Sequence, residues 1–284
     1  MNVIPVPPSY DEDESLCLTD TTKYLSFLQD HRCSTVMTTA GTSQFNLLSQ
    51  DEIRSLNNCV SSFEGKVILG LPPLPLNQVI EFVKNSKECN NSHWMALYPD
   101  RYYDNESIID YFKHIREHSD KRIYVHGMFT RSGYGGTWNY TSDVLNQLCE
   151  EDIICGIKEE HSELQKSYDV LRELPTELDV IVAGGSMRRH QFLRSSGANS
   201  FLAGIGNMFP TIEEKYAQGI DVDNCINKES KLFSVFGKYG WHRSLRIGLA
   251  CLGLGCYNDR RPYPQRHIHV VQAIEKIIRE LSHV

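Results

Sequence analysis

The chain has 284 residues, of which 40% are hydrophobic and 23% are charged, and its formal net charge at pH 7 is −7. These values are typical of a globular enzyme with one large α/β domain, with or without a short appendage. Because no basic run is present, we expect no nucleic acid and no anionic membrane as a partner. No segment has the ~18 apolar residues of a membrane span, and the first residues lack the features of a signal peptide.

The nine cysteines are scattered along the sequence and form no CxxC pair. An odd number of dispersed cysteines, some of them inside apolar runs, indicates a reduced and therefore cytoplasmic protein. No cluster of cysteine and histidine has the spacing of zinc ligands, so we expect no metal site.

Short apolar runs rich in β-branched residues predict eight strands, which begin near residues 3, 35, 67, 95, 123, 153, 180 and 200. Most successive starts are roughly 27 to 33 residues apart, the length of one strand, one helix and their two loops. Eight such units predict a closed (β/α)8 TIM barrel. An open doubly wound sheet is the alternative, but the segment VPPSYDEDES after the first run is not a glycine-rich dinucleotide loop.

Amphipathic segments between these runs predict the helices. Residues 105–118 form one apolar stripe, made up of Ile108, Ile109, Phe112 and Ile115. Residues 210–219 begin another helix directly after the last strand region. We expect the barrel to occupy residues 1–220 and the remaining residues, 221–284, to form a helical appendage packed on it.

Polar residues stand where several predicted strands end, the position at which TIM barrels carry their catalytic groups. They include Thr38 and Thr39, His126, Lys158 and Gly184. Lys158 follows the apolar run IICGI, so its amine is expected to be partly buried, and burial disfavours an ammonium ion. A neutral amine can attack a carbonyl and form a Schiff base. The alternative is a lysine that reaches solvent or pairs with a nearby carboxylate.

These motifs resemble those of the dihydrodipicolinate synthase / N-acetylneuraminate lyase family of class I aldolases, over nearly the whole chain. GIKEEHSE is similar to the motif around the family's Schiff-base lysine, which implies that Lys158 is the catalytic lysine. TTAGTSQFNLLSQDE is similar to the segment that holds the carboxylate of the 2-oxo acid. The resemblance therefore implies a set of substrate-binding residues, namely Thr39, Ala40, Ser43, Gly184 and Phe201.

The resemblance has departures in the residues that transfer protons. An ungapped match places His126 where the family has a proton-relaying tyrosine at the end of the fifth strand. The family's Tyr-Tyr-Asn after the fourth strand has only Tyr102 or Tyr103 as a counterpart. His126 and Tyr103 are accordingly the candidate catalytic residues beside the lysine, and either His126 replaces the relay or it only lines the mouth of the barrel.

Arg131 lies in the segment TRSG, which is similar to the Ser-Arg-Thr-Gly of the synthases. In those enzymes the arginine binds the carboxylate of the second substrate, a role that suits a guanidinium because it donates two parallel hydrogen bonds. The alternative is an arginine in a solvated loop. This match favours a synthase-like member over a sialic acid lyase.

We therefore expect a Schiff-base-forming lyase or aldolase that acts on pyruvate or a related 2-oxo acid, with an aldehyde as a second substrate, most like 4-hydroxy-tetrahydrodipicolinate synthase. The family chemistry implies no cofactor, because the protonated imine serves as the electron sink. Its members are commonly tetrameric, which implies a homo-oligomer, a tetramer or a dimer. Two alternatives remain: a catalytically degenerate member that binds a 2-oxo acid as a regulatory protein, and a barrel without a ligand.

Overall fold

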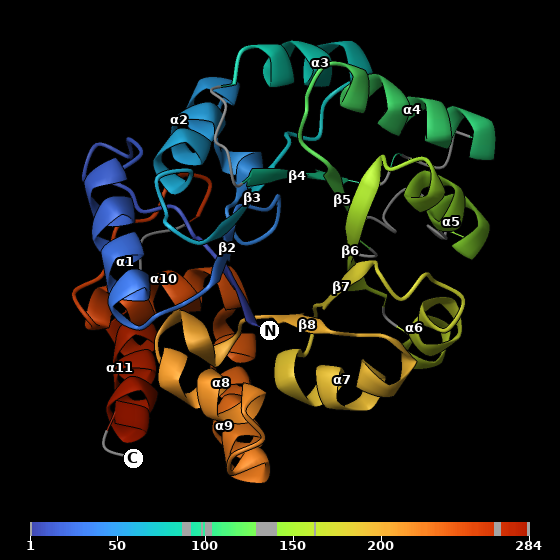
Figure 1. Cartoon of the computed structure of the whole chain (residues 1–284). Coiled ribbons are helices and arrows are strands. Elements are labelled where there is room, and N and C mark those ends of the chain that lie inside the picture. Colours follow the sequence, from blue (N-terminus) through green and yellow to red (C-terminus); the bar gives the residue numbers. More distant parts are fainter. Residues whose placement is uncertain are drawn as a thin grey trace. The chain divides into compact units, whose positions relative to one another are not determined.

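The structure is a computed structural model that describes residues 2–86, 92–97, 99, 104–128, 141–161, 163–263 and 268–282. Eight parallel strands close into a barrel in sequence order (Figure 1). They are β1 (Asn2–Pro5), β2 (Thr35–Met37), β3 (Lys66–Gly70), β4 (Ser92–Leu97), β5 (Ile123–Met128), β6 (Ile154–Glu160), β7 (Asp179–Val182) and β8 (Ser200–Leu202). The predicted (β/α)8 barrel is confirmed, and the open sheet is excluded.

Helices follow the strands, and further helices follow the last of them. They are α1 (Leu18–Asp30), α2 (Gln50–Val60), α3 (Leu76–Lys84), α4 (Asn105–Glu117), α5 (Ser142–Glu150), α6 (Leu164–Leu171), α7 (Ser186–Leu193), α8 (Pro210–Ala217), α9 (Val222–Tyr239), α10 (Trp241–Cys251) and α11 (Ile268–Ser282). None of the helices in the described ranges is long and apolar enough to cross a membrane.

Helix α4 illustrates how local sequence determines these elements. Its N-cap is Asp104, whose carboxylate accepts a hydrogen bond of 2.8 Å from the backbone N–H of Ser107. Such a cap satisfies one of the backbone donors that the first turn of a helix leaves unpaired. The four residues of the predicted apolar stripe are all buried, as expected. The helix therefore forms where the sequence periodicity predicts it.

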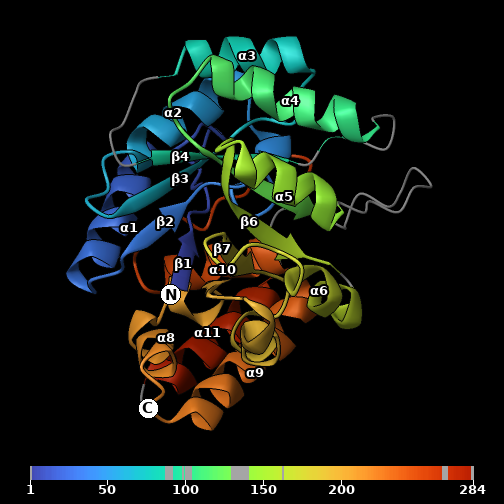
Figure 2. The ribbon, with the colours of Figure 1, turned by 45° about the vertical axis from the view of Figure 1, so that its right-hand side comes forward.

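The chain divides into two compact units, Ile68–Leu202 and the combination of Asn2–Val67 with Ala203–Val284. In the first unit, α3 and α4 pack side by side (Figures 1 and 2). In the second unit, α9, α10 and α11 pack against one another (Figure 2). The C-terminal segment is thus helical and groups with the start of the chain, and the domain boundary expected at residue 220 stays a prediction.

Hydrogen bonds within the second unit tie its two chain segments together. The Asn207 side-chain amide donates to the carbonyl oxygen of Pro5 at 2.7 Å, and the backbone N–H of Cys256 donates to Ser9 Oγ at 3.1 Å. Backbone carbonyls and hydroxyls inside a fold require such partners, since an unpaired buried polar group is costly. These bonds therefore fix the C-terminal segment to the first residues of the chain.

Close packing between β5 and β6 in the first unit depends on Gly156. Tyr124 pairs with Gly156 across the two strands, and its hydroxyl donates a hydrogen bond of 2.6 Å to the Asp179 carboxylate. A Cβ atom on Gly156 would overlap the Tyr124 ring and lie 2.6 Å from the carbonyl oxygen of Asp179. The absent side chain therefore provides the space that the tyrosine ring occupies.

We expect the substitution Gly156→Ala to lower the free energy of unfolding by about 1–3 kcal/mol, because the added methyl group overpacks this part of the core. Urea denaturation measures the change. The matched control is Gly237→Ala in α9, where an added Cβ meets no atom within 4 Å. That control should raise the stability by about 1 kcal/mol, since alanine is the better helix former. Equal effects of the two substitutions would contradict this role of Gly156.

Candidate active site

Lys158 lies inside β6, two residues before the strand ends, and its side chain is only 3% exposed. Its neighbours across the sheet are His126 on β5 and Ile181 on β7. Directly paired residues of parallel strands point to the same face of the sheet, so Lys158 and His126 extend in the same direction. The pairing of β5 with β6 therefore brings together two of the predicted catalytic residues.

The side chains of Lys158, His126 and Glu160 form a triangle of polar contacts. Lys158 Nζ lies 2.7 Å from His126 Nε2 and 2.7 Å from Glu160 Oε2. The third side of the triangle, from His126 Nε2 to Glu160 Oε2, measures 3.1 Å. Glu160 joins the group because side chains two residues apart on a strand lie on the same face.

The carboxylate of Glu160 is ionised in this triangle. Partial burial by itself raises the pKa of this carboxyl group, because a charged form is less favourable away from water. The positive charge of Lys158, the contact with His126 and the hydrogen bond from Lys158 outweigh that effect and bring the pKa of Glu160 well below its ordinary value. Glu160 therefore carries a negative charge at neutral pH, directly beside the amine of Lys158.

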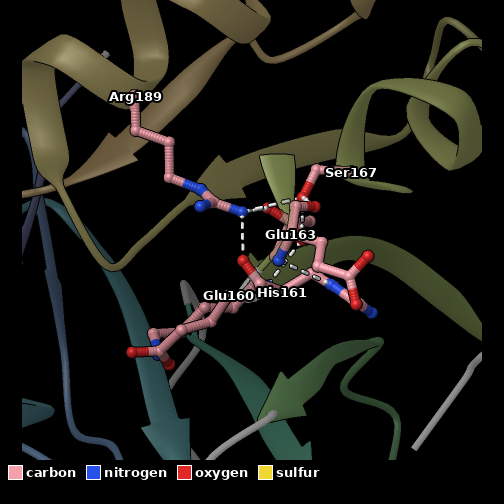
Figure 3. Close-up of polar contacts among 7 residues, drawn as sticks. Glu160, His161, Glu163, Ser167 and Arg189 are labelled. Carbon is pink, nitrogen blue, oxygen red and sulfur yellow. Dashed lines mark hydrogen bonds and ion pairs between the residues drawn. The ribbon is translucent and has the colours of Figure 1, made fainter. Parts of the chain in front are cut away.

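A buried network around Glu159 lies on the opposite face of β6, and Figure 3 shows its partners Arg189, His161 and Ser167. Arg189 of α7 donates hydrogen bonds through Nη2 to the Glu159 carboxylate at 2.8 Å, to the His161 carbonyl oxygen at 2.6 Å and to Ser167 Oγ at 2.7 Å. Ser167 of α6 and the backbone N–H of His161 also donate to Glu159. Figure 3 shows the Glu160 side chain extending away from this cluster. The network thus fixes the end of β6 against α6 and α7.

His161 belongs to this network rather than to the triangle. Burial lowers the pKa of its imidazole, and Lys166 and Arg189 act in the same direction against the charges of Glu159 and Glu163. Its Nδ1 accepts a hydrogen bond of 3.1 Å from the backbone N–H of Glu163. The neutral ring therefore serves as a partner of the backbone where the chain leaves β6.

Two of the predicted substrate-binding residues, Gly184 and Phe201, come after β6 in the chain, and their surroundings differ. Gly184 comes after β7 with φ +70°, and a Cβ there would contact Cγ of Glu160 at 3.5 Å. Phe201 of β8 pairs with Val182, which itself pairs with Glu159. Its buried ring packs 5.2 Å from the ring of His190 on α7. Gly184 thus adjoins the triangle, whereas the side chain of Phe201 points to the helix side of the sheet, away from Lys158.

Thr39, Ala40 and Ser43 form a tight turn after β2, in the second unit. Ser43 Oγ donates to the carbonyl oxygen of Val6 at 2.7 Å and accepts a hydrogen bond of 3.0 Å from the Thr39 N–H. The Ala40 carbonyl accepts from the N–H of Phe45 at 3.2 Å. The Thr39 hydroxyl is buried and has no hydrogen-bond partner within the described residues. Ser43 therefore holds the turn together, and Thr39 retains a hydroxyl that a ligand can engage.

The remaining predictions fall on Tyr103, with its alternative Tyr102, and on Arg131, which all lie outside the described residues. Glu160, by contrast, is a residue that the sequence interpretation did not propose as part of the site. The sequence could have indicated Glu160, because it stands two residues after Lys158. Residues at this spacing lie on the same face of a strand, provided that the strand continues past the lysine. The described triangle is therefore Lys158, His126 and Glu160.

Comparison with known proteins identifies distant sequence relatives of the chain. No family model matches the chain. The 4-hydroxy-tetrahydrodipicolinate synthase of Karelsulcia muelleri is 24% identical over 218 residues, which make up 74% of this chain and 71% of that protein. The 2-dehydro-3-deoxy-phosphogluconate/2-dehydro-3-deoxy-6-phosphogalactonate aldolase of Sulfurisphaera tokodaii is 21% identical over 248 residues, or 83% of this chain and 82% of that protein.

A solved structure has a similar fold. A prophage protein of the dihydrodipicolinic acid synthase family from E. coli K12, in complex with pyruvate, superposes with a TM-score of 0.84 at 11% identity. The match covers 99% of this chain and 98% of that protein. Taken with the two sequence relatives, it shows that the chain is similar to proteins of the dihydrodipicolinate synthase family at low sequence identity.

Proposed function

We propose that this protein is a Schiff-base-forming lyase that acts on pyruvate or a related 2-oxo acid, with Lys158 as the nucleophile. The observation that carries the proposal is the position of the Lys158 amine, which is almost fully buried and lies 2.7 Å from His126 Nε2. A nucleophile within hydrogen-bond distance of a base is the usual arrangement for covalent catalysis. The relatives that act as synthase and aldolase support the same class of reaction.

In the proposed reaction, His126 removes a proton from Lys158, and the amine attacks the ketone carbon of the 2-oxo acid. Loss of water gives a protonated imine, which withdraws electrons from the adjacent carbon. The carbon can then lose a proton to form an enamine that adds to an aldehyde, as in a synthase like 4-hydroxy-tetrahydrodipicolinate synthase, or the same steps can run in reverse to cleave a carbon–carbon bond. Protein side chains supply all of the proton transfers.

We also propose that the turn of residues 39–43 binds the carboxylate of the substrate. The Thr39 hydroxyl, which is buried and lacks a partner in the described part of the chain, is one donor for it. A buried donor that gains an anionic acceptor is stabilised more than one that gains a neutral acceptor. The role proposed for Ser43 is indirect, since its hydroxyl already bonds to Val6 and Thr39.

Borohydride trapping tests the proposed function. The wild-type protein is incubated with pyruvate, reduced with sodium borohydride and measured as intact protein by mass spectrometry. We expect one reduced pyruvate adduct per chain, because borohydride converts the imine into a stable secondary amine. A wild-type protein that gains no mass with pyruvate or with other 2-oxo acids would contradict the proposal.

A second candidate function is a regulatory protein that binds a 2-oxo acid without turning it over. The ion pair of 2.7 Å between Lys158 and Glu160 favours it, because a paired ammonium ion is not a nucleophile. Calorimetry combined with trapping separates the two candidates. Binding of pyruvate without an adduct after reduction indicates the regulatory protein, and an adduct indicates the lyase.

Arg131 is proposed to bind the carboxylate of the second substrate. We expect Arg131→Ala to raise the KM of that substrate far more than the KM of pyruvate. The loss of one bidentate, charge-assisted contact corresponds to about 1.5–3 kcal/mol. Steady-state kinetics with pyruvate and a panel of aldehydes measures both constants. Equal changes in the two KM values, or no change, would return Arg131 to the role of a solvated loop residue.

A further inference from the structure

We propose that Glu160 is a third catalytic residue, whose carboxylate stabilises the His126 imidazolium that forms when His126 takes a proton from Lys158. The inference rests on the proposed function, because it assigns a role within the same triangle. Glu160 contacts the reacting nitrogen itself, since Lys158 Nζ lies 2.7 Å from its Oε2. It is therefore placed to act on the chemical step directly.

The triangle fits two protonation states without movement of any heavy atom. With Lys158 as an ammonium ion and His126 neutral, Lys158 donates to both partners, and the 3.1 Å contact between Nε2 and Glu160 joins two acceptors. When one proton moves from Nζ to Nε2 across 2.7 Å, the imidazolium donates to Glu160. The lone pair of the Lys158 amine is then available for attack. Glu160 thus gains a hydrogen bond in the state that Lys158 needs for attack.

Burial explains why the imidazolium needs this partner. His126 is 1% exposed, so a positive charge on its ring has almost no contact with water. An isolated charge in such surroundings is strongly unfavourable unless an opposite charge offsets it. Glu160 supplies that charge and is itself 27% exposed, so its own ionisation is partly supported by solvent. A carboxylate at this position therefore makes proton transfer to His126 feasible.

The protons of the imine-forming step balance within the triangle. Lys158 gives one proton to His126, and its amine adds to the carbonyl carbon. A proton moves from the nitrogen of the adduct to its oxygen, which gives a carbinolamine. The imidazolium of His126 then protonates the hydroxyl group, which leaves as water. In total, an ammonium ion and a ketone give a protonated imine and water, and no oxidation or reduction takes place.

A second role for Glu160 predicts the opposite experimental result. If Glu160 served only as a counter-ion, it would hold Lys158 as an ammonium ion and slow the attack. The variant Glu160→Gln would then release the neutral amine and form the imine faster than the wild type. If Glu160 stabilises the imidazolium, the same variant forms the imine more slowly. The sign of the change in rate therefore distinguishes the two roles.

The experiment measures the rate of imine formation with pyruvate near neutral pH, by borohydride quenching at successive times and intact-protein mass spectrometry. We expect Glu160→Gln to slow adduct formation on the order of 10²-fold, the usual effect of losing one catalytic electrostatic contact. Glu160→Asp, which retains the carboxylate, should recover part of the rate. The matched control is Glu163→Gln, because Glu163 is 58% exposed and its carboxylate pairs with Lys166. That control should react at the wild-type rate.

A double-variant comparison adds a readout that a structural role would not change. In a His126→Asn background, we expect Glu160→Gln to cause no further loss of rate, because no imidazolium remains to be stabilised. An unchanged or faster rate in Glu160→Gln, or additive losses in the double variant, would overturn the proposal. Should Glu160→Gln fail to fold, Glu160→Ser gives the same comparison. A wild-type protein without an adduct instead overturns the proposed function itself, which is a distinct outcome.

Discussion

Replacing Lys158 with methionine is expected to abolish the pyruvate adduct and to lower turnover on the order of 10³-fold or more, because the substitution removes the amine that forms the proposed imine. Methionine has nearly the length of the lysine stem, so the buried position in β6 stays filled. Glu160 loses its partner but is 27% exposed, so water can solvate its carboxylate. The fold should therefore survive the substitution, which circular dichroism and thermal unfolding can verify.

Two further variants make this result specific. Lys158→Arg keeps the positive charge beside Glu160 but has no nucleophilic amine, and it should also form no adduct. Lys166→Met is the matched control, because Lys166 is 46% exposed on α6 and pairs with Glu163. It should trap pyruvate at the wild-type rate. An adduct that persists in Lys158→Met, located on another lysine by peptide mapping, would show that the nucleophile has been assigned to the wrong residue.

The barrel could be predicted from the sequence because its signals are local. Each strand corresponds to a short apolar run in the sequence. The near-constant spacing of these runs reflects the length of one strand–helix unit. The apolar stripe that begins at Ile108 likewise follows from the spacing of apolar residues within a single helix. Such features require no knowledge of distant contacts, and the observed elements follow them closely.

Whether Glu160 belongs to the triangle with Lys158 and His126 depends on the residue at which β6 ends. The apolar run stops before Lys158, so the sequence indicated a strand that ends at the lysine, whereas the strand continues to Glu160. Two polar residues prolong it because its opposite face is anchored by Glu159 and Arg189, which are far apart in the sequence. Periodicity cannot reveal such an anchor. For this reason the sequence alone does not indicate that Glu160 belongs to the site.

Distant contacts also determine the turn after β2. The sequence offered Ser43 as a direct ligand of the substrate, but its hydroxyl bonds to Val6, a residue on a different part of the chain. A serine in a turn has the same sequence signature whether it binds a ligand or holds the backbone. Only the three-dimensional arrangement separates that role from the role of Thr39, whose hydroxyl has no partner among the described residues.

His126 is expected to give the pH profile of the enzyme its acidic limb. A general base must be neutral to accept a proton, so activity should fall as the pH is lowered and the imidazole becomes protonated. Glu160 cannot be the source of that limb, because its pKa lies well below the ordinary value for a carboxyl group owing to Lys158 and His126. The limb should therefore follow the imidazole rather than the carboxylate of Glu160.

The variant His126→Asn tests this assignment. We expect kcat/KM to fall about 10²- to 10⁴-fold, the usual contribution of a positioned base, and the acidic limb of the pH profile to disappear. Lys158 should remain trappable by borohydride, although more slowly, because its amine is still present. The matched control is His114→Asn, since His114 is exposed on α4 and its ring bonds to the Asp110 carbonyl. Normal turnover with an unchanged pH profile in His126→Asn would assign the relay to Tyr103 or Tyr102 instead.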